Sequence, residues 1–390
     1  MALAASGRVV VLPQAPQAGS LTAAAVDAVL TDHPEHFQGY SLLPAPGTYA
    51  DSAPEVRLPP DGANIEFFTS GSSGLPKRVP KTYAQLRLEV EALERQWGTS
   101  LGAAAMVGTV PHYHLYGVLF RILWPLLTGR SFFREICLHP AALREAALHG
   151  DCAIVSSPAF LGRITDYSDL PPPSKVRAVF SSGSLLPDDA ARRLAECWGK
   201  PSIEVYGSTE TGGIAWRTWK DPNERELWKP ILGVETDVRE ETIGSRLWVK
   251  SGCTWNGDWA PTGDHARRQE NGFELLGRAD DVVKLEDKRL SLAEMRAKLL
   301  QHAWVADARL LLLDGRRRCI GAVVILNTAG NAALTSVGKV RVNQALRDCL
   351  RTSYEALLVP RKWRYVAMLP DNDMGKVERA WLEQLFKVKP

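Results

Sequence analysis

Apolar and polar residues alternate through the first part of the chain with two different periods. Short apolar runs rich in β-prone residues cover 65–68, 106–110, 153–156, 176–180 and 203–206. Between them, segments with helical spacing or helix end signals cover 82–97, 140–150 and 187–199. Thr82 and Gln85, for example, form a capping box before apolar residues at helical spacing. Strands that alternate with helices predict an α/β fold whose sheets are mainly parallel and covered by helices.

The pattern changes after about residue 280. Ser291 and Glu294 form a second capping box, which precedes two strands, a helix and a third strand. The ranges expected for these later elements are 308–313, 319–326, 344–358 and 363–369, with a short helix at 378–386. We therefore expect a large N-terminal domain at 1–279 and a small α+β C-terminal domain at 280–390. Residues 41–63, rich in Pro, Gly and Ala, are predicted to be a linker or surface loop.

The composition excludes several classes of protein. The chain has 390 residues, of which 45% are hydrophobic and 23% charged, which argues against collagen-like, coiled-coil and wholly disordered chains. Its six cysteines are spread singly, which favours neither a disulfide framework nor a structural zinc site, so a reducing compartment is expected. Arg121 and Pro125 interrupt the most apolar stretch, residues 115–127. We therefore expect a cytoplasmic protein without a membrane span.

The charges are unevenly distributed along the chain. Residues 281–390 carry 20 Lys and Arg against 12 Asp and Glu, a net +8, whereas residues 1–280 carry 27 against 32, a net −5. The only tight basic cluster, residues 316–318, lies in a predicted turn and has no interleaved aromatic residues. Nucleic acid is therefore not an expected partner.

One segment directly after a strand is built to hold a phosphate. Small residues there leave backbone N–H groups and hydroxyls free, and a lysine follows; the residues are Thr69, Ser70, Gly71, Ser72, Ser73, Gly74 and Lys77. The spacing does not match a Walker loop. Taken alone, the segment could equally be a flexible Gly/Ser turn.

Further motifs follow this segment in a set order, and together they resemble the signatures of the adenylate-forming superfamily, which contains acyl- and aryl-CoA synthetases. The similar segments are Pro111-His112-Tyr113-His114-Leu115-Tyr116-Gly117, Ser182-Gly183-Ser184-Leu185-Leu186-Pro187, Tyr206-Gly207-Ser208-Thr209-Glu210, Leu247–Gly252, Thr262-Gly263-Asp264, Gly277–Lys284 and Met374-Gly375-Lys376. The resemblance runs from residue 67 to residue 376, so it covers most of the chain.

The resemblance implies an ATP-dependent reaction in which a carboxylate attacks the α-phosphorus and pyrophosphate leaves. Thr69 to Gly74 and Lys77 would screen the leaving group, together with Mg²⁺ held by Glu210. Thr209 would donate to the α-phosphate. Lys376 would bridge the carboxylate and the α-phosphate oxygens, where negative charge is most crowded.

The remaining motif residues would hold the nucleotide and the acid. Adenine would stack on Tyr206, next to Gly207, with Ser182, Gly183 and Ser184 as the opposite wall. Asp264 would accept both ribose hydroxyls and Arg278 would reinforce that contact. His114 would border the acid pocket and the thiol channel, although a packed histidine bonded to backbone is the alternative.

The family also implies movement between the two domains. Rotation about a hinge residue, here Asp280, would exchange Lys376 for the 278–289 loop between adenylation and thioester formation. A small mobile C-terminal domain is therefore expected.

This chain departs from the family pattern in two places. Few residues precede the phosphate loop, so most of the customary N-terminal subdomain is expected to be missing, and a second copy of this chain could cover the exposed surface. Asp287 stands where the family usually has Gly, which puts the usual CoA channel in doubt. Because carrier proteins are acidic and residues 281–390 are basic, we favour an acyl carrier protein over CoA as the thiol acceptor.

The expected function is therefore an acid–thiol ligase of the AMP-forming acyl- or aryl-acid type. The acid would be an aryl acid such as a hydroxybenzoate, or a short or medium acyl chain. Two alternatives remain open: an enzyme that only adenylates, and a catalytically inactive scaffold that binds nucleotide.

Overall fold

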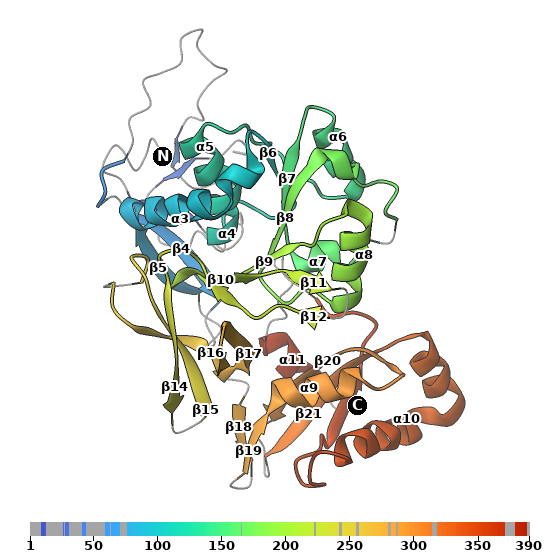
Figure 1. The fold of residues 1–390 in the computed structure, drawn as a ribbon. Coiled ribbons are helices and arrows are strands. Elements are labelled where there is room, and N and C mark those ends of the chain that lie inside the picture. The colour runs from blue at the N-terminus through green and yellow to red at the C-terminus, as the bar shows by residue number, and fades with distance from the viewer. Residues whose placement is uncertain are drawn as a thin grey trace. The chain divides into compact units, whose positions relative to one another are not determined.

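The computed structural model describes most of the chain. The described residues are 9–12, 26, 28–30, 41–43, 59–62, 64–70, 76–164, 166–221, 224–241, 244–254, 257–279, 282–285, 288–313, 318–370 and 379–387. They divide into two compact units (Figure 1). The first unit contains residues 1–226, 230–235 and 250–259, and the second contains 227–229, 236–249 and 260–390.

A six-stranded sheet forms the centre of the first unit, in the order β13-β10-β9-β8-β7-β6. Strands β6 (Ala105–Gly108), β7 (Cys152–Ser156), β8 (Val176–Ser182) and β9 (Ile203–Ser208) are parallel, as predicted. Strand β10 (Gly212–Arg217) pairs antiparallel with β9, and β13 covers Lys229–Pro230. The predicted mixed α/β fold is thus confirmed.

Helices connect these strands and cover the sheet. The predicted helices are present as α3 (Tyr83–Leu101), α6 (Pro140–Ala147) and α8 (Asp188–Trp198), and shorter ones are α4 (Leu115–Gly117), the π-helix η2 (Val118–Leu123), α5 (Trp124–Thr128), α7 (Pro158–Leu161) and η3 (Pro173–Lys175). The capping box at the start of α3 has both of its reciprocal hydrogen bonds, between Thr82 and Gln85. Helix α8 ends at Gly199, which adopts the left-handed conformation that favours glycine.

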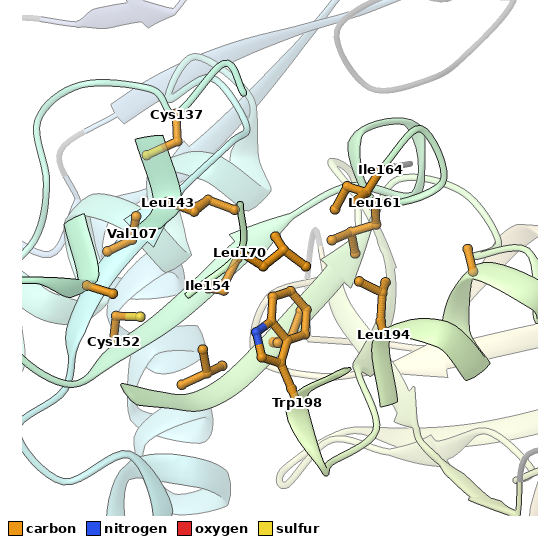
Figure 2. Packing of buried hydrophobic residues seen from close by; sticks show 14 of the residues in the cluster. Val107, Cys137, Leu143, Cys152, Ile154, Leu161, Ile164, Leu170, Leu194 and Trp198 are labelled. Atoms are coloured by element: carbon orange, nitrogen blue, oxygen red, sulfur yellow. The ribbon is translucent and has the colours of Figure 1, made fainter. Parts of the chain in front are cut away.

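Apolar side chains fill both faces of the parallel sheet. Val179 of β8 faces a cluster that joins β6, β7, α6 and α8, where Leu143, Ile154 and Trp198 are almost completely buried (Figure 2). Phe180, the next residue, faces the opposite side, where its ring contacts Trp97 of α3 and aromatic rings of η2 and α5. This alternation is what a strand covered on both faces requires.

The run at 65–68 lies in a different sheet from the other four runs. It belongs to β4 (Asn64–Ser70), which pairs with β1 (Val10–Leu12) and β5 (Pro76–Thr82) in a separate three-stranded sheet. Strand β5 was not predicted, because Pro76 and Pro80 argue against a strand in a sequence reading. The shorter strands of this unit are β2 (Val29–Leu30), β3 (Leu42–Leu43), β11 (Trp219–Asp221) and β12 (Glu224–Arg225). Most of the predicted linker at 41–63 lies outside the described residues.

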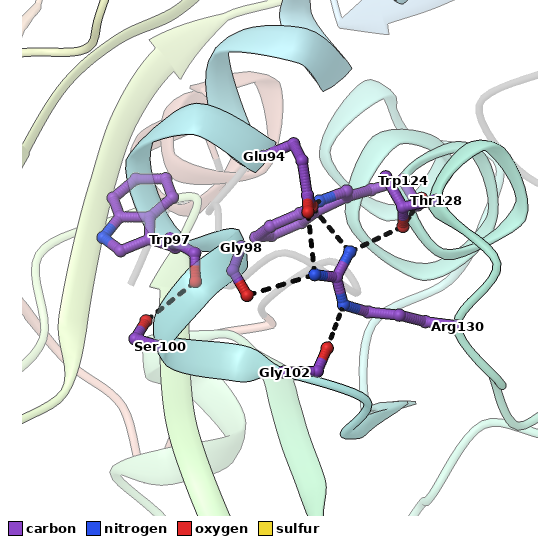
Figure 3. Close-up of polar contacts among 8 residues, drawn as sticks. All are labelled: Glu94, Trp97, Gly98, Ser100, Gly102, Trp124, Thr128 and Arg130. Carbon is purple, nitrogen blue, oxygen red and sulfur yellow. Dashed lines mark hydrogen bonds and ion pairs between the residues drawn. The ribbon is translucent and has the colours of Figure 1, made fainter.

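A polar network fastens the end of α3 to the end of α5 (Figure 3). Glu94 of α3 accepts from both terminal nitrogens of Arg130, at 2.6 and 2.9 Å, and from the indole N–H of Trp124 at 2.7 Å. Arg130 also donates to the carbonyl oxygens of Gly98 and Gly102 at the end of the helix. The bond to Gly102 gives a partner to a carbonyl at the helix end, and the bond to Gly98 adds to the one that this carbonyl accepts from the Gly102 N–H.

In the second unit, a four-stranded sheet and a two-stranded pair precede the predicted small α+β domain. A four-stranded sheet has the order β14 (Glu235–Glu241), β15 (Gly244–Lys250), β16 (Ala260–Gln269), β17 (Gly272–Arg278), and β18 (Val282–Leu285) pairs with β19 (Lys288–Ser291). The predicted α-β-β-α-β order follows as α9 (Leu292–Leu300), β20 (Val305–Leu313), β21 (Cys319–Leu326), α10 (Thr328–Arg351) and β22 (Lys362–Tyr365), then α11 (Arg379–Lys387). Helix α10 begins 16 residues before the predicted start, is kinked at Gly338 and ends before 358. No helix among these described stretches is long and apolar enough to cross a membrane.

Candidate active site

The predicted nucleotide-binding residues of the first unit gather where parallel strands end. Ser182, the last residue of β8, is in register with Val205 of β9, so the turn that follows it lies beside Tyr206. Gly183 in that turn has φ +105°, a conformation that favours glycine. The carboxyl edge of a parallel sheet is where open α/β folds bind ligands. Ser182 to Ser184 and Tyr206 therefore lie side by side at this edge, and their role as two sides of a nucleotide site stays a prediction.

The turn that carries Thr209 and Glu210 joins β9 to β10 and is closed by hydroxyl groups. The Oγ atoms of Ser208 and Thr211 lie 2.9 Å apart, and the backbone N–H of Thr211 donates to the Ser208 hydroxyl at 3.2 Å. Gly207 is in register with Gly213 across the hairpin, which brings the two backbones together. A closed turn of this kind presents Thr209 and Glu210 at its tip.

Lys77 and Glu210 come together from distant parts of the sequence. Lys77 Nζ lies 3.3 Å from Glu210 Oε1, and both side chains are about half exposed. Burial raises the pKa of Glu210, but its own backbone N–H, the charge of Lys77 and the Ser208 hydroxyl outweigh it, so the pKa falls below its usual value. An ionised carboxylate at an open position suits Mg²⁺, which proteins hold through one or two carboxylates together with substrate phosphates.

The phosphate segment spans the tip of the β4–β5 hairpin. Register pairs Ser70 with Pro76 and Thr69 with Lys77, so the hairpin ends where the predicted phosphate loop begins. Gly71, Ser72, Ser73 and Gly74 lie outside the described residues, as do the side chains of Thr69 and Ser70. The hairpin nevertheless places Lys77 beside Glu210.

Two buried charges below this turn were missed in the sequence. Lys81 of β5 is 2% exposed, and its Nζ donates to the carbonyl oxygens of Glu210 at 2.8 Å and Cys253 at 2.7 Å. Glu89 of α3 is 7% exposed, and its Oε2 accepts from the backbone N–H of Gly213 at 2.9 Å. A signal for Glu89 exists, because it stands at helical spacing between apolar residues that are buried.

A buried ion pair connects the strands behind Tyr206. Glu204 of β9 and Arg217 of β10 form two hydrogen bonds, of 3.2 and 2.9 Å, and are 2% and 7% exposed. Glu204 also accepts from the Trp219 indole at 3.3 Å and from the Leu186 backbone N–H at 3.5 Å. Because Leu186 follows the Ser182–Ser184 turn, Glu204 links both sides of the predicted adenine site.

His114 follows the end of β6 and caps the short helix α4 from the same edge of the sheet. Its carbonyl oxygen accepts from Val118, and its ring lies 4.8 Å from that of Tyr113. Nearby, Thr109 after β6 and Ser156 at the end of β7 are joined at 2.8 Å between hydroxyls. His114 is thus at the carboxyl edge, and its role toward acid and thiol stays a prediction.

The two residues predicted to bind the ribose lie in the second unit. Asp264 of β16 and Arg278 of β17 are register partners, with 4.0 Å between the guanidinium and the carboxylate. A side chain at Gly263 would meet the Arg278 guanidinium at 2.8 Å, so the glycine leaves room for this contact. The predicted support of Asp264 by Arg278 is consistent with this geometry.

Several predicted residues cannot be placed. Lys376, the hinge residue Asp280 and Asp287 lie outside the described residues. Their roles, and the predicted boundary at 279/280, stay predictions. The second compact unit starts earlier in the chain than this boundary, but a hinge is defined by movement and not by compactness.

Comparison with known proteins identifies relatives along most of the chain. The 4-coumarate–CoA ligase of Cereibacter sphaeroides is 28% identical over 316 residues, covering 81% of this chain and 70% of that protein. The sulfoacetate–CoA ligase of Cupriavidus necator is 26% identical over 370 residues, covering 87% and 70%. The crystal structure of ATP-bound MatB from Rhodopseudomonas palustris shares the fold with a TM-score of 0.74 at 16% identity, over 94% of this chain and 80% of that one.

The family itself is shown by a direct match. Residues 2–249 match the family model described as AMP-binding enzyme, which is well over half of the chain. This match and the ligase relatives confirm the predicted superfamily and the predicted enzyme class, an AMP-forming acid ligase. With its nucleotide-site motifs at the carboxyl edge of a parallel sheet, the chain belongs to the AMP-binding enzyme family.

Proposed function

We propose that this enzyme activates a carboxylic acid with ATP and Mg²⁺, releases pyrophosphate, and transfers the acyl group from the acyl-adenylate to a phosphopantetheine thiol. The observation that carries the proposal is the ion pair between Lys77 and Glu210. It joins the phosphate-loop hairpin to the turn that bears Thr209, so that a cation and a carboxylate face the same substrate position. The relatives named above are ligases that join acids to CoA.

The first half-reaction places negative charge on the leaving pyrophosphate and around the α-phosphorus. Lys77 would move from Glu210 toward the β- and γ-phosphates, because a phosphate offers more negative charge than one carboxylate. Mg²⁺ on Glu210 would neutralise further charge on the phosphates. Thr209 would donate its hydroxyl to an α-phosphate oxygen.

The nucleotide would be oriented by residues that do not react. Tyr206 offers an aromatic face to adenine, opposite Ser182 to Ser184, and Glu204 fixes both strands from behind. Asp264, supported by Arg278, would accept the ribose hydroxyls. Lys376 would complete the site during adenylation.

Charge supports a carrier protein as the acceptor. Residues 281–390 have a net charge of +8, which complements an acidic helical carrier surface. CoA, which presents the same thiol, is the alternative acceptor. Asp287, which stands in place of the usual Gly, argues against the usual CoA channel. That substitution also motivates the second candidate, an enzyme that stops at the adenylate. An aryl acid or a short to medium acyl chain would be the substrate, in the cytoplasm, where the six free cysteines would stay reduced.

The experiment is acid-dependent pyrophosphate release, with hydroxylamine to trap the adenylate, measured across aryl acids and C2 to C16 acyl chains. We expect saturable, Mg²⁺-dependent release with one class of acid. CoA and a holo acyl carrier protein are then offered separately, and thioester formation with the carrier protein is the expected result. ATP binding without release on any acid would favour the scaffold alternative.

A further inference from the structure

Two opposite charges are buried on either side of the turn that bears Glu210. Lys81 Nζ donates to the Glu210 carbonyl, at the tip of the turn, and Glu89 Oε2 accepts from the N–H of Gly213, in strand β10 just after the turn. The two side chains come from β5 and α3, so two separate elements hold a four-residue segment by its backbone. Hydrogen bonds to charged groups are stronger than neutral ones, and these two are nearly shielded from water.

The same cluster leaves little space for the turn to move. A side chain on Gly212 would meet Glu89 Oε1 at 2.6 Å, which shows that the carboxylate lies directly against the backbone there. On the far side, Lys81 also donates to the Cys253 carbonyl, and the Cys253 thiol donates to the Gln85 carbonyl at 3.4 Å. The turn is therefore tied to a segment of the chain, at 251–254, that is itself fastened to α3.

Stability alone is a poor explanation for this arrangement. Burial lowers the pKa of Lys81 and raises the pKa of Glu89, and the charge of each partner only partly opposes the change. Buried opposite charges contribute little net stability compared with apolar side chains of similar size, because burial removes both from water. Both charges nevertheless end on the backbone of a single turn, and that turn carries two residues of the proposed phosphate chemistry.

We infer that Lys81 and Glu89 are positioning residues that fix the 209–213 turn, so that Thr209 and Glu210 meet the α-phosphate and Mg²⁺ in one geometry. This inference rests on the proposed function, since it concerns the same nucleotide site. Both side chains are buried and bonded to backbone groups, so they would act on the substrate only through the turn. Replacing either side chain should therefore weaken the binding of Mg·ATP and leave the binding of the acid unchanged.

The test uses Lys81→Met, Glu89→Gln and the double variant, with full-length enzyme. We expect Lys81→Met to raise the KM for ATP and the Mg²⁺ concentration for half-maximal rate about tenfold, since each lost charge-assisted bond is worth roughly that factor. The KM for the acid should change less than twofold. Glu89→Gln, which keeps an oxygen for Gly213, should have a smaller effect in the same direction.

A matched control and the double variant separate positioning from stability. Arg130→Met breaks a network of similar size at the other end of α3 and should lower Tm without changing the ATP and Mg²⁺ dependence. The double variant removes both charges and should recover part of the Tm lost in Lys81→Met while the KM for ATP stays high. An unchanged KM for ATP in Lys81→Met, or the same kinetic change in Arg130→Met, would overturn the inference.

A direct binding measurement tests the inference without requiring catalytic turnover. Calorimetry with Mg²⁺ and a non-hydrolysable ATP analogue should show about tenfold weaker Mg²⁺-dependent binding to Lys81→Met. Wild-type binding without acid-dependent release would contradict the proposed function alone, whereas equal binding by wild type and Lys81→Met would contradict the positioning role.

Discussion

At the scale of single residues, Gly212 has little conformational freedom. Its φ of +77° disfavours any side chain, and a Cβ atom would also meet Glu89 at 2.6 Å. We expect Gly212→Ala to lower the free energy of unfolding by about 3 kcal/mol, at the upper end of the range for a strained backbone position, and to abolish most pyrophosphate release. Urea unfolding monitored by tryptophan fluorescence gives the first quantity.

Gly199 provides the control for that substitution. It has φ +65° but nothing lies within 4 Å of a Cβ atom there, so Gly199→Ala introduces backbone strain alone. This variant should lose about 1 kcal/mol and keep its activity. Equal losses in the two variants would show that Glu89 does not restrict the turn.

The pair of Glu204 and Arg217 permits a prediction about buried charge. Arg217→Met would leave a carboxylate that is 2% exposed with only the Trp219 indole and a long backbone bond. We expect a loss of about 3–5 kcal/mol in the free energy of unfolding, measured by urea titration. Adding Glu204→Gln should restore part of it. A loss below 1 kcal/mol in the single variant would contradict a tight, dry pair.

Much of the site was predictable because its residues stand in ordered motifs. The structure brings Lys77 next to Glu210 and the Ser182–Ser184 turn next to Tyr206, as the motif order predicts, while their roles toward the nucleotide stay predictions. Lys81 and Glu89 were not found, because their partners are backbone groups more than 120 residues away; the position of Glu89 on the apolar side of α3 indicates burial but not its partner. Residues in sequence motifs are therefore easier to predict than residues that position a turn through its backbone.

At the scale of elements, the residues that cap helices predicted helix ends correctly. The Thr82 capping box and Gly199 gave the start of α3 and the end of α8 correctly. Strand β5 was missed because its prolines argue against a strand. The sheet β14–β17 was missed because its strands lack the apolar runs of a buried parallel strand. The start of α10 was missed because its first half is mostly exposed and has no apolar stripe.

The contact between α3 and α5 should make stability depend on pH. The Arg130 hydrogen bonds hold the pKa of Glu94 below its usual range, with a smaller contribution from Trp124, although burial opposes them. A carboxylate with a lowered pKa stabilises the fold above its unfolded pKa of about 4.3, and this contribution is lost as pH falls through the folded pKa.

Glu94→Gln removes that dependence. Urea midpoints of wild type and Glu94→Gln should differ most above about pH 5 and converge as the pH falls toward 3. A difference that stays constant down to pH 3 would mean that the charge of Glu94 does not stabilise the fold. The Arg87–Glu91 pair on the exposed side of α3 provides the control, because Glu91→Gln should shift the midpoint little at any pH.

At the scale of the whole molecule, the residues of the proposed reaction belong to both compact units. The Lys77–Glu210 pair belongs to the first unit, and Asp264 and Arg278 belong to the second. Lys376, which the family resemblance assigns to adenylation, lies near the C-terminal end of the sequence. If the C-terminal domain supplies this lysine only for the first half-reaction, its removal must affect the two steps unequally.

Lys376→Ala tests that division. We expect acid-dependent pyrophosphate release to fall at least about 10²-fold, the usual effect of removing one group that stabilises developing charge. Thioester formation from a chemically prepared acyl-adenylate should stay within about threefold of wild type, because that step needs no new charge stabilisation at the α-phosphorus. Lys387→Ala, an exposed lysine of α11, should change neither rate. Pyrophosphate release that survives in Lys376→Ala would mean that the charge on the α-phosphate is neutralised within the first unit, by Lys77, Thr209 and the metal on Glu210 alone.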